Sequence, residues 1–160
     1  MRRKRAGYFE QSQGAPLPIR ITIERRVAFN EVDAMAIAWH GRYAEYFEEA
    51  SNELRRQCGF AYQDFKSANM YAPIVQLHID YHKSLVLDER LSITAMLIWT
   101  EAARLNIEYQ AYNEDSVLAA SGYTVQLFTD AVTGESCITS PVIQQQCQKK
   151  WLAGDFGGLQ

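Results

Sequence analysis

The chain has few cysteines, and their placement argues against two common roles. Its 160 residues include three of them, Cys58, Cys137 and Cys147, which form no close pair and no CxxC motif. An odd and scattered set is a poor disulfide framework and a poor zinc site. We therefore expect structural thiols in a protein of a reducing, cytoplasmic compartment.

Long hydrophobic runs and a surplus of positive charge are also lacking. No apolar run approaches the ~18–20 residues that cross a membrane. The basic residues 2–5 resemble the charged part of a signal peptide, but the mixed, polar residues 6–14 follow them, so export is not expected. Nineteen acidic and sixteen basic residues give a net charge of -3, which argues against a broadly basic nucleic-acid-binding protein. We expect neither a membrane nor a nucleic-acid partner.

The length predicts one folded domain with a short segment at each end. A typical domain has ~150 residues, and 48% hydrophobic with 22% charged residues is ordinary for a globular protein. We interpret residues 1–18, with their basic cluster and two closing prolines, as a flexible basic arm that is either solvated or in contact with an anionic partner. The folded domain is expected at 19–153 and a C-terminal tail at 154–160.

The spacing of apolar residues predicts an α+β fold. In segment 19–29, isoleucines first alternate with polar residues, which indicates a half-buried strand. From Tyr43 the apolar positions follow helical spacing, and Gly59 is a typical helix stop. Four alternating segments end near residues 82, 99, 111 and 127, and Ser140 with Pro141 is typical of the start of a closing helix. Short polar turns permit only antiparallel neighbours, so we expect one sheet curled around the long helix.

The loop at 30–43, between the first strand and the long helix, is the most informative segment for chemistry. Residues 40–42 offer no Ser, Thr, Asp or Asn as an N-cap, so the first N–H groups of the helix lack a side-chain acceptor. A carboxylate beside them, Asp33, would combine a base or nucleophile with an oxyanion site, as acyl transfer requires. The alternative is a loop carboxylate that accepts from nearby backbone donors, with His40 merely covering the helix end.

Residues 32–43 and 46–50 resemble the signature of hot-dog-fold acyl-CoA thioesterases, above all those related to 4-hydroxybenzoyl-CoA thioesterase. Further matches lie at 58–60, 88–91 and 122–125, so the resemblance spans about 19–141. It implies a hot-dog fold, in which a five-stranded antiparallel sheet wraps around a central helix, here with an added C-terminal helix. It also implies a homodimer or homotetramer with active sites at the subunit interface.

The same resemblance implies hydrolysis of an acyl-CoA thioester to a free acid and coenzyme A, without a metal or redox cofactor. Asp33 would be the catalytic carboxylate, as nucleophile or general base, and His40 would assist it. A backbone N–H near His40 would hold the thioester oxygen. The residues implied for substrate binding are Trp39, Gly41, Tyr43 and Phe47.

The family's glycine three residues after the aspartate is Ala36 here, and a second frequent glycine is Met35. Glycine permits backbone angles that these residues resist, so the departures bear on acyl preference more than on the chemistry. Two other functions stay open: a non-catalytic binder of acyl-CoA or acyl-carrier protein, and a thioesterase for carrier-protein thioesters in polyketide or fatty-acid assembly.

Several other side chains have simpler interpretations. Glu48 or Glu49 on the helix could replace Asp33 as the base, but a solvated or structural role is commoner. His78, Asp80 and His82 share one strand face, yet alternate residues of a strand lie ~6.6–6.8 Å apart, so a tight metal site is not expected. The basic residues that could meet coenzyme A phosphates are Lys83, Arg90 and Arg104, and the large aromatics expected in the core are Trp39, Phe47, Tyr81 and Trp99.

Overall fold

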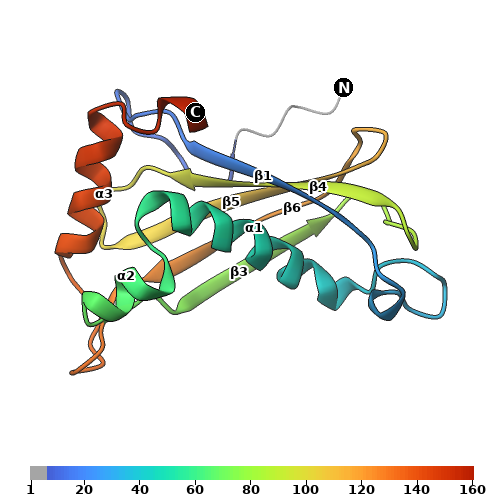
Figure 1. The fold of residues 1–160 in the computed structure, drawn as a ribbon, viewed down its shortest axis with the longest axis horizontal. Helices are drawn as coiled ribbons and strands as arrows, with labels where there is room; N and C mark the ends of the chain where they lie inside the picture. Colours follow the sequence, from blue (N-terminus) through green and yellow to red (C-terminus); the bar gives the residue numbers. More distant parts are fainter. Residues whose placement is uncertain (1–6) are drawn as a thin grey trace.

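A computed structural model describes residues 7–160, and Figure 1 shows its elements. The strands are β1 (Ile19–Arg26), β2 (Met70–Tyr71), β3 (Ile74–Tyr81), β4 (Arg90–Ile98), β5 (Arg104–Asn113), β6 (Leu118–Leu127) and β7 (Thr129–Asp130). The α-helices are α1 (Tyr43–Cys58), α2 (Tyr62–Ser67) and α3 (Val142–Leu152). Short 3-10 helices are η1 (Phe29–Glu31), η2 (His40–Arg42) and η3 (Gly157–Leu159).

Within these residues, one five-stranded antiparallel sheet has the order β1-β4-β5-β6-β3. The hairpins β4–β5 and β5–β6 pair as their short turns predict. The edge strands are β1 and β3, although β3 directly precedes the neighbour of β1, strand β4, in the chain. Helix α1 runs across one face of the sheet (Figure 1). The predicted α+β fold, with a sheet around a central helix and a C-terminal helix, is confirmed.

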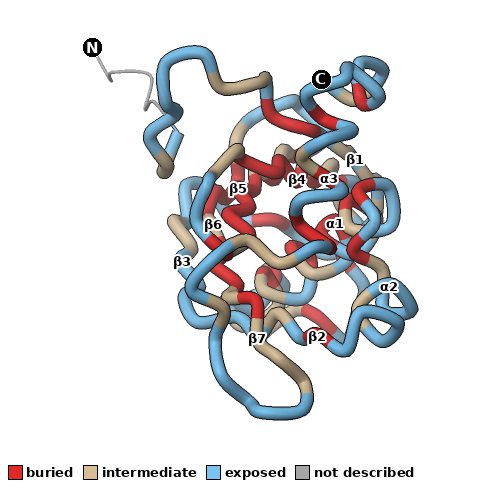
Figure 2. Tube along the Cα trace, turned by 90° about the vertical axis from the view of Figure 1, so that its left-hand side faces the viewer, coloured by how far each residue is buried: buried red, intermediate tan, exposed pale blue. Residues whose placement is uncertain are grey.

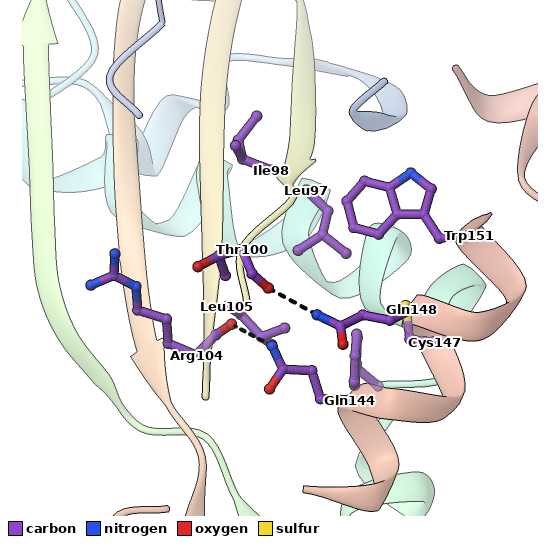
Figure 3. A pocket seen from close by; sticks show the side chains of 10 residues that line it. Leu97, Ile98, Thr100, Arg104, Leu105, Gln144, Cys147, Gln148 and Trp151 are labelled. Carbon is purple, nitrogen blue, oxygen red and sulfur yellow. Dashed lines mark hydrogen bonds between the residues drawn. The ribbon is translucent and has the colours of Figure 1, made fainter. Parts of the chain in front are cut away.

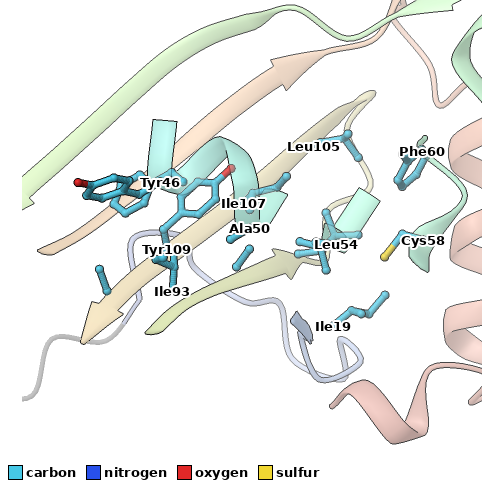
Figure 4. Close-up of a cluster of buried hydrophobic side chains, with 14 of the residues drawn as sticks. Ile19, Tyr46, Ala50, Leu54, Cys58, Phe60, Ile93, Leu105, Ile107 and Tyr109 are labelled. Atoms are coloured by element: carbon cyan, nitrogen blue, oxygen red, sulfur yellow. The ribbon is translucent and has the colours of Figure 1, made fainter. Parts of the chain in front are cut away.

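The core lies between α1 and the sheet. Tyr46, Phe47, Ala50 and Leu54 recur at helical spacing and are fully buried. Figure 4 shows this side of the helix facing aliphatic and aromatic side chains of β4 and β5, and Figure 2 shows the buried positions gathered in the same layer. The Phe47 ring stacks on Tyr109 at 4.6 Å, with planes 5° apart. This stacking packs the helix directly against β5.

Helix α3 closes one end of the sheet. Gln144 and Gln148 donate side-chain hydrogen bonds of 2.8 Å to the carbonyls of Ala102 and Thr100 in the β4–β5 turn. Figure 3 shows Gln148 reaching this turn beside a cavity of about 10 Å³. That volume is about the size of one water molecule, so the contact between α3 and the sheet is structural.

Four local predictions differ from the structure, and two elements were not predicted. Strand β1 ends at Arg26 and not at 29, because the backbone turns into η1. Helix α3 begins at Val142, with Pro141 extended at its N-cap, so Ser140 does not cap it. Helix α2 and the small β2–β7 sheet were not predicted. Trp39 and Tyr81 are 47% and 52% exposed and are not core residues. Trp39 lies in the loop before α1, and β3, which carries Tyr81, is an edge strand that α1 leaves partly uncovered.

The boundaries of the arm and tail stay predictions, and the basic residues 2–5 lie outside the described part of the chain. Tyr8 donates to Asp80 and shares a hydrogen bond with Ser121, both at 2.6 Å, on the sheet face away from α1. Near the other end, Trp151 donates to the Leu17 carbonyl at 2.9 Å.

Among residues 7–160, no helix has the length and apolarity to cross a membrane.

Candidate active site

The loop that carries Asp33 is a tight hairpin closed by the bridge between Val32 and Ala38. Inside it, the Asp33 carboxylate accepts the Met35 N–H at 2.8 Å, and the Asp33 carbonyl accepts the Ala36 N–H at 3.0 Å. Ala36 has φ 58°, in the left-handed region that favours glycine. The loop therefore keeps a glycine-type turn at the position where the resembled family has glycine. Asp33 stays half-buried at its tip.

Glu31, which precedes this loop, connects it to β1 and α1. It is only 7% exposed and pairs with the Arg25 guanidinium of β1. Its other oxygen accepts the Ala28 N–H at 2.8 Å and the Tyr46 hydroxyl at 3.1 Å. Burial, and next the Glu31 carboxylate, raise the pKa of Tyr46, so that hydroxyl stays a donor at neutral pH. The Glu31 carbonyl also accepts the Trp39 N–H at 2.8 Å, which ties the far end of the loop to the same point.

The start of α1 is uncapped, as the sequence predicts. Helix η2 runs directly into α1, and neither N-cap residue, Trp39 or Arg42, makes a side-chain capping bond. The N–H groups of His40 and Gly41 are the first two of η2, and no earlier turn of the helix offers them an acceptor. The free N–H groups and the helix dipole favour negative charge at this point. They form one half of the site that the sequence predicts.

The ring of Trp39 packs directly over Gly41. A Cβ at position 41 would lie 2.2 to 2.7 Å from three atoms of that ring. The ring also lies against His40, with centroids 4.9 Å apart. The turn and the two aromatic side chains before it therefore form one packed unit.

A surface pocket of about 330 Å³ lies where the Asp33 loop, the start of α1 and the end of β3 meet. Asp33, His40 and Tyr43 all line it, so the structure brings these three predicted residues together. The other predicted binding residues, Trp39, Gly41 and Phe47, do not line it. Trp39 and Gly41 are the chain neighbours of His40, and Phe47 is buried against Tyr109. The remaining lining residues are Met35, Ile37, Ala38, Tyr81, His82, Lys83 and Ser84.

Tyr81 is the lining residue whose position sequence reasoning missed. Its hydroxyl donates to the His40 carbonyl at 2.8 Å, and its ring meets Tyr43 edge-on, with centroids 5.0 Å apart. Burial raises the pKa of both tyrosine hydroxyls above the ordinary value of 10.0. The signal available in sequence was its place as the last residue of an alternating strand, just before the polar residues 82–84.

The other carboxylates considered from sequence lie outside this pocket. Glu48 pairs with Arg55 at 2.5 Å, and Glu49 pairs with Arg25. Neither is among the lining residues, so Asp33 is the carboxylate that the pocket presents.

The remaining candidate side chains make separate contacts. His78 lies 3.1 Å from Asp80, whereas His82 is hydrogen-bonded to Ser121 at 2.8 Å. Of the three basic candidates for phosphate contacts, Lys83 alone lines this pocket. Arg90 pairs with Glu24 at 3.1 Å, and Arg104 lines the small cavity under α3.

The three cysteines are free thiols, and Cys58 and Cys147 are buried. A hydrogen bond with Cys147, together with burial, raises the pKa of Cys58. A thiol with a raised pKa is a poor nucleophile, which supports the structural interpretation. Both thiols also line a larger hollow of about 590 Å³ between α2 and α3, whose described lining includes no histidine.

Comparison with known proteins identifies the family and the fold. A family model described as the thioesterase-like superfamily matches residues 27–147. Acyl-CoA thioesterase YbgC of Haemophilus influenzae is 27% identical over 95 residues, which cover 59% of this chain and 70% of the relative. A 1,4-dihydroxy-2-naphthoyl-CoA hydrolase of Thermosynechococcus vestitus is 27% identical over 100 residues, covering 62% and 68%. A DHNA-CoA thioesterase structure from Staphylococcus aureus shares the fold, with TM-score 0.73 and 23% identity over 88% of this chain and 95% of that chain.

Proposed function

Because the chain belongs to the thioesterase-like superfamily, we propose that it hydrolyses an acyl-CoA thioester, with Asp33 as nucleophile or general base. The observation that carries the proposal is that Asp33 and His40, at the uncapped start of α1, line the same pocket. The relatives named as acyl-CoA and 1,4-dihydroxy-2-naphthoyl-CoA hydrolases support coenzyme A thioesters as the substrate class.

Two routes are open to the Asp33 carboxylate. It can attack the thioester carbon, expelling coenzyme A thiolate and leaving an anhydride that water then hydrolyses. It can instead remove a proton from water as that water attacks the same carbon, after which the C–S bond breaks and coenzyme A thiolate leaves. In both routes negative charge develops on the thioester oxygen, and the free N–H groups at His40 and Gly41 supply donors for it. Thiolate is a good leaving group, so this small apparatus is sufficient.

The other lining residues suit the two ends of such a substrate. His40 lines the same pocket as Asp33, which supports an assisting role for its side chain at the reacting group. Tyr43 and Ile37 line it as well and would form an apolar wall for the acyl chain. Lys83 is the first choice for a phosphate of coenzyme A, because an exposed ammonium at the pocket edge can meet it without being desolvated.

The direct test is a panel of aliphatic and aromatic acyl-CoA esters, with thiol release followed by a colorimetric thiol reagent. The same acyl groups are then offered on acyl-carrier protein. Hydrolysis of a coenzyme A ester by the wild type, and by Glu48→Gln and Glu49→Gln, would support the assignment. Binding without turnover of any ester would favour a non-catalytic binder. Preference for the carrier-protein esters would move the substrate to that class.

Gly41→Ala is expected to lower kcat/KM by about tenfold to 10²-fold, because the new methyl group displaces the Trp39 ring or the turn that holds the oxyanion donors. Gly157→Ala is the matched control, since a Cβ there meets open space. The measurement is steady-state kinetics on the best ester of the panel. Wild-type kcat/KM in Gly41→Ala would show that the geometry of this turn is not needed.

We also propose that the chain forms a homodimer through β3. Four apolar residues of this edge strand are about half exposed: Ile74 48%, Val75 51%, Leu77 49% and Tyr81 52%. A long apolar edge strand is a ready site for pairing with a second chain. Pairing of two β3 strands would extend the sheet and place both pockets near the interface. A homotetramer built from such dimers stays an alternative.

Charging this edge is expected to separate the subunits. Val75→Lys with Leu77→Lys should change the species in solution from twice the 18.3 kDa chain mass to a monomer, because like charges then face each other across the paired strands. Size-exclusion chromatography with light scattering measures the mass, and Thr22→Lys on the opposite edge strand β1 is the control. A monomeric wild type, or a dimer that survives the double substitution, would contradict the pairing.

A further inference from the structure

Tyr81 links the edge strand to the turn that precedes α1. Its hydroxyl donates to the His40 carbonyl at 2.8 Å. No other hydroxyl or side-chain N–H among residues 7–160 reaches that carbonyl. The tie is long-range, since 41 positions separate the two residues in the chain. The end of β3 therefore holds a specific peptide group of the candidate active site.

That peptide group also contains the Gly41 N–H. A carbonyl that accepts a hydrogen bond draws electron density from its amide nitrogen, which makes the N–H on the same peptide a better donor. The Gly41 N–H is the second of η2, where no earlier turn of the helix offers an acceptor. Its donor strength is thus available to a ligand.

We infer that Tyr81 is a positioning residue, whose hydroxyl orients and polarises the His40–Gly41 peptide so that its N–H stabilises the negative charge on the thioester oxygen. The inference rests on the proposed function. It deepens that function by naming the group that tunes the oxyanion donor from another element of the fold.

The hydroxyl and the ring of Tyr81 make separate contacts, with the His40 carbonyl and with Tyr43. The ring packs edge-on against Tyr43, and that contact needs no hydroxyl. Phenylalanine at position 81 would therefore keep the packing and lose only the hydrogen bond. Because Tyr81 is 52% exposed, the substitution also leaves the buried core untouched.

The size of the effect follows from two magnitudes. Cooperative strengthening amounts to ~10–30% of a hydrogen bond, and one oxyanion donor is worth ~10²–10³ in rate. If the donor's contribution to the logarithm of kcat falls by this same fraction, kcat should be about two- to eightfold lower in Tyr81→Phe. KM should stay within about twofold, since the donor acts on charge that develops only in the transition state.

The experiment compares wild type, Tyr81→Phe and 3-fluorotyrosine at position 81, with Tyr62→Phe on α2 as the control. Tyr62 is 75% exposed and lies outside the pocket. Fluorination strengthens the hydroxyl as a donor, so the expected order of kcat is Phe below Tyr, with fluorotyrosine equal to or above Tyr. Equal kcat for Phe and Tyr, or a change confined to KM, would overturn the inference.

A second readout does not need turnover. Backbone NMR should show the His40 carbonyl carbon and the Gly41 N–H shifting on loss of the hydroxyl in Tyr81→Phe, and unchanged in Tyr62→Phe. Unmoved resonances would overturn the hydrogen bond and with it the inference. If the wild type shows no turnover that depends on Asp33, the proposed function fails, and the catalytic role of Tyr81 with it. If that turnover exists and Tyr81→Phe leaves it unchanged, only the inference fails.

Discussion

Asp33→Asn is expected to lower kcat by about 10²–10⁴-fold, the range associated with loss of a general base. An amide can neither attack the thioester carbon effectively nor take a proton from water. The substitution suits this site because the amide oxygen can still accept the Met35 N–H that the carboxylate accepts at 2.8 Å. The loop should therefore keep its shape, and thermal unfolding should be close to that of the wild type.

Asp64→Asn provides the matched control for that result. Asp64 also accepts a backbone N–H, from Ala61 at 2.8 Å, and lines the hollow between α2 and α3 instead of the Asp33 pocket. Its kcat should equal the wild-type value. Equal activity of Asp33→Asn and wild type on every ester would remove Asp33 from the chemistry, and a selective loss in Asp64→Asn would move the site to the other hollow.

Glu31→Ala should destabilise the fold by about 3–5 kcal/mol, the cost of breaking a buried ion pair by removing one partner. The substitution leaves the Arg25 guanidinium, the Tyr46 hydroxyl and the Ala28 N–H without their shared acceptor. The free energy of unfolding in urea measures the loss. Activity should fall as well, because the Glu31 side chain fixes the segment before the Asp33 loop to Arg25 and Tyr46.

Glu49→Ala is the control for this second prediction. Glu49 pairs with the same arginine, but its side chain is 49% exposed. A surface ion pair contributes about 0–1 kcal/mol, so the free energy of unfolding should barely change. If Glu31→Ala were as stable as Glu49→Ala, the buried network would not be what holds the loop.

Regular elements could be predicted from the sequence because each has a strong period. Helix α1 combines apolar residues every three or four positions with a stop at Gly59, which has φ 80°. Strands β4 and β5 contain apolar residues at alternate positions, and the two strands pair antiparallel, as the short turn between them predicts. Helix α2 has six residues, too few for a helical period to stand out. The order of the strands was also hidden, because alternation does not say whether a strand is central or at an edge.

The site was only partly predictable for a similar reason. Asp33 and His40 lie seven residues apart, so local reasoning could bring them together, and they line one pocket. Tyr81 reaches this pocket from a distant strand, and Phe47 turns into the core, because the packing of β3 and α1 decides both. Glu31 could not be singled out, since a charged residue in a loop is ordinarily solvated. Only the folded chain shows it buried against Arg25.

The most direct measurement is a crystal structure of Asp33→Asn with an acyl-CoA ester or its non-hydrolysable analogue bound. The thioester oxygen should lie about 2.7–3.1 Å from the backbone nitrogen of His40 or Gly41. The side chain at position 33 should lie about 3–3.5 Å from the carbonyl carbon. An acyl carbonyl seated between α2 and α3, or one with its oxygen turned away from the start of α1, would contradict the account.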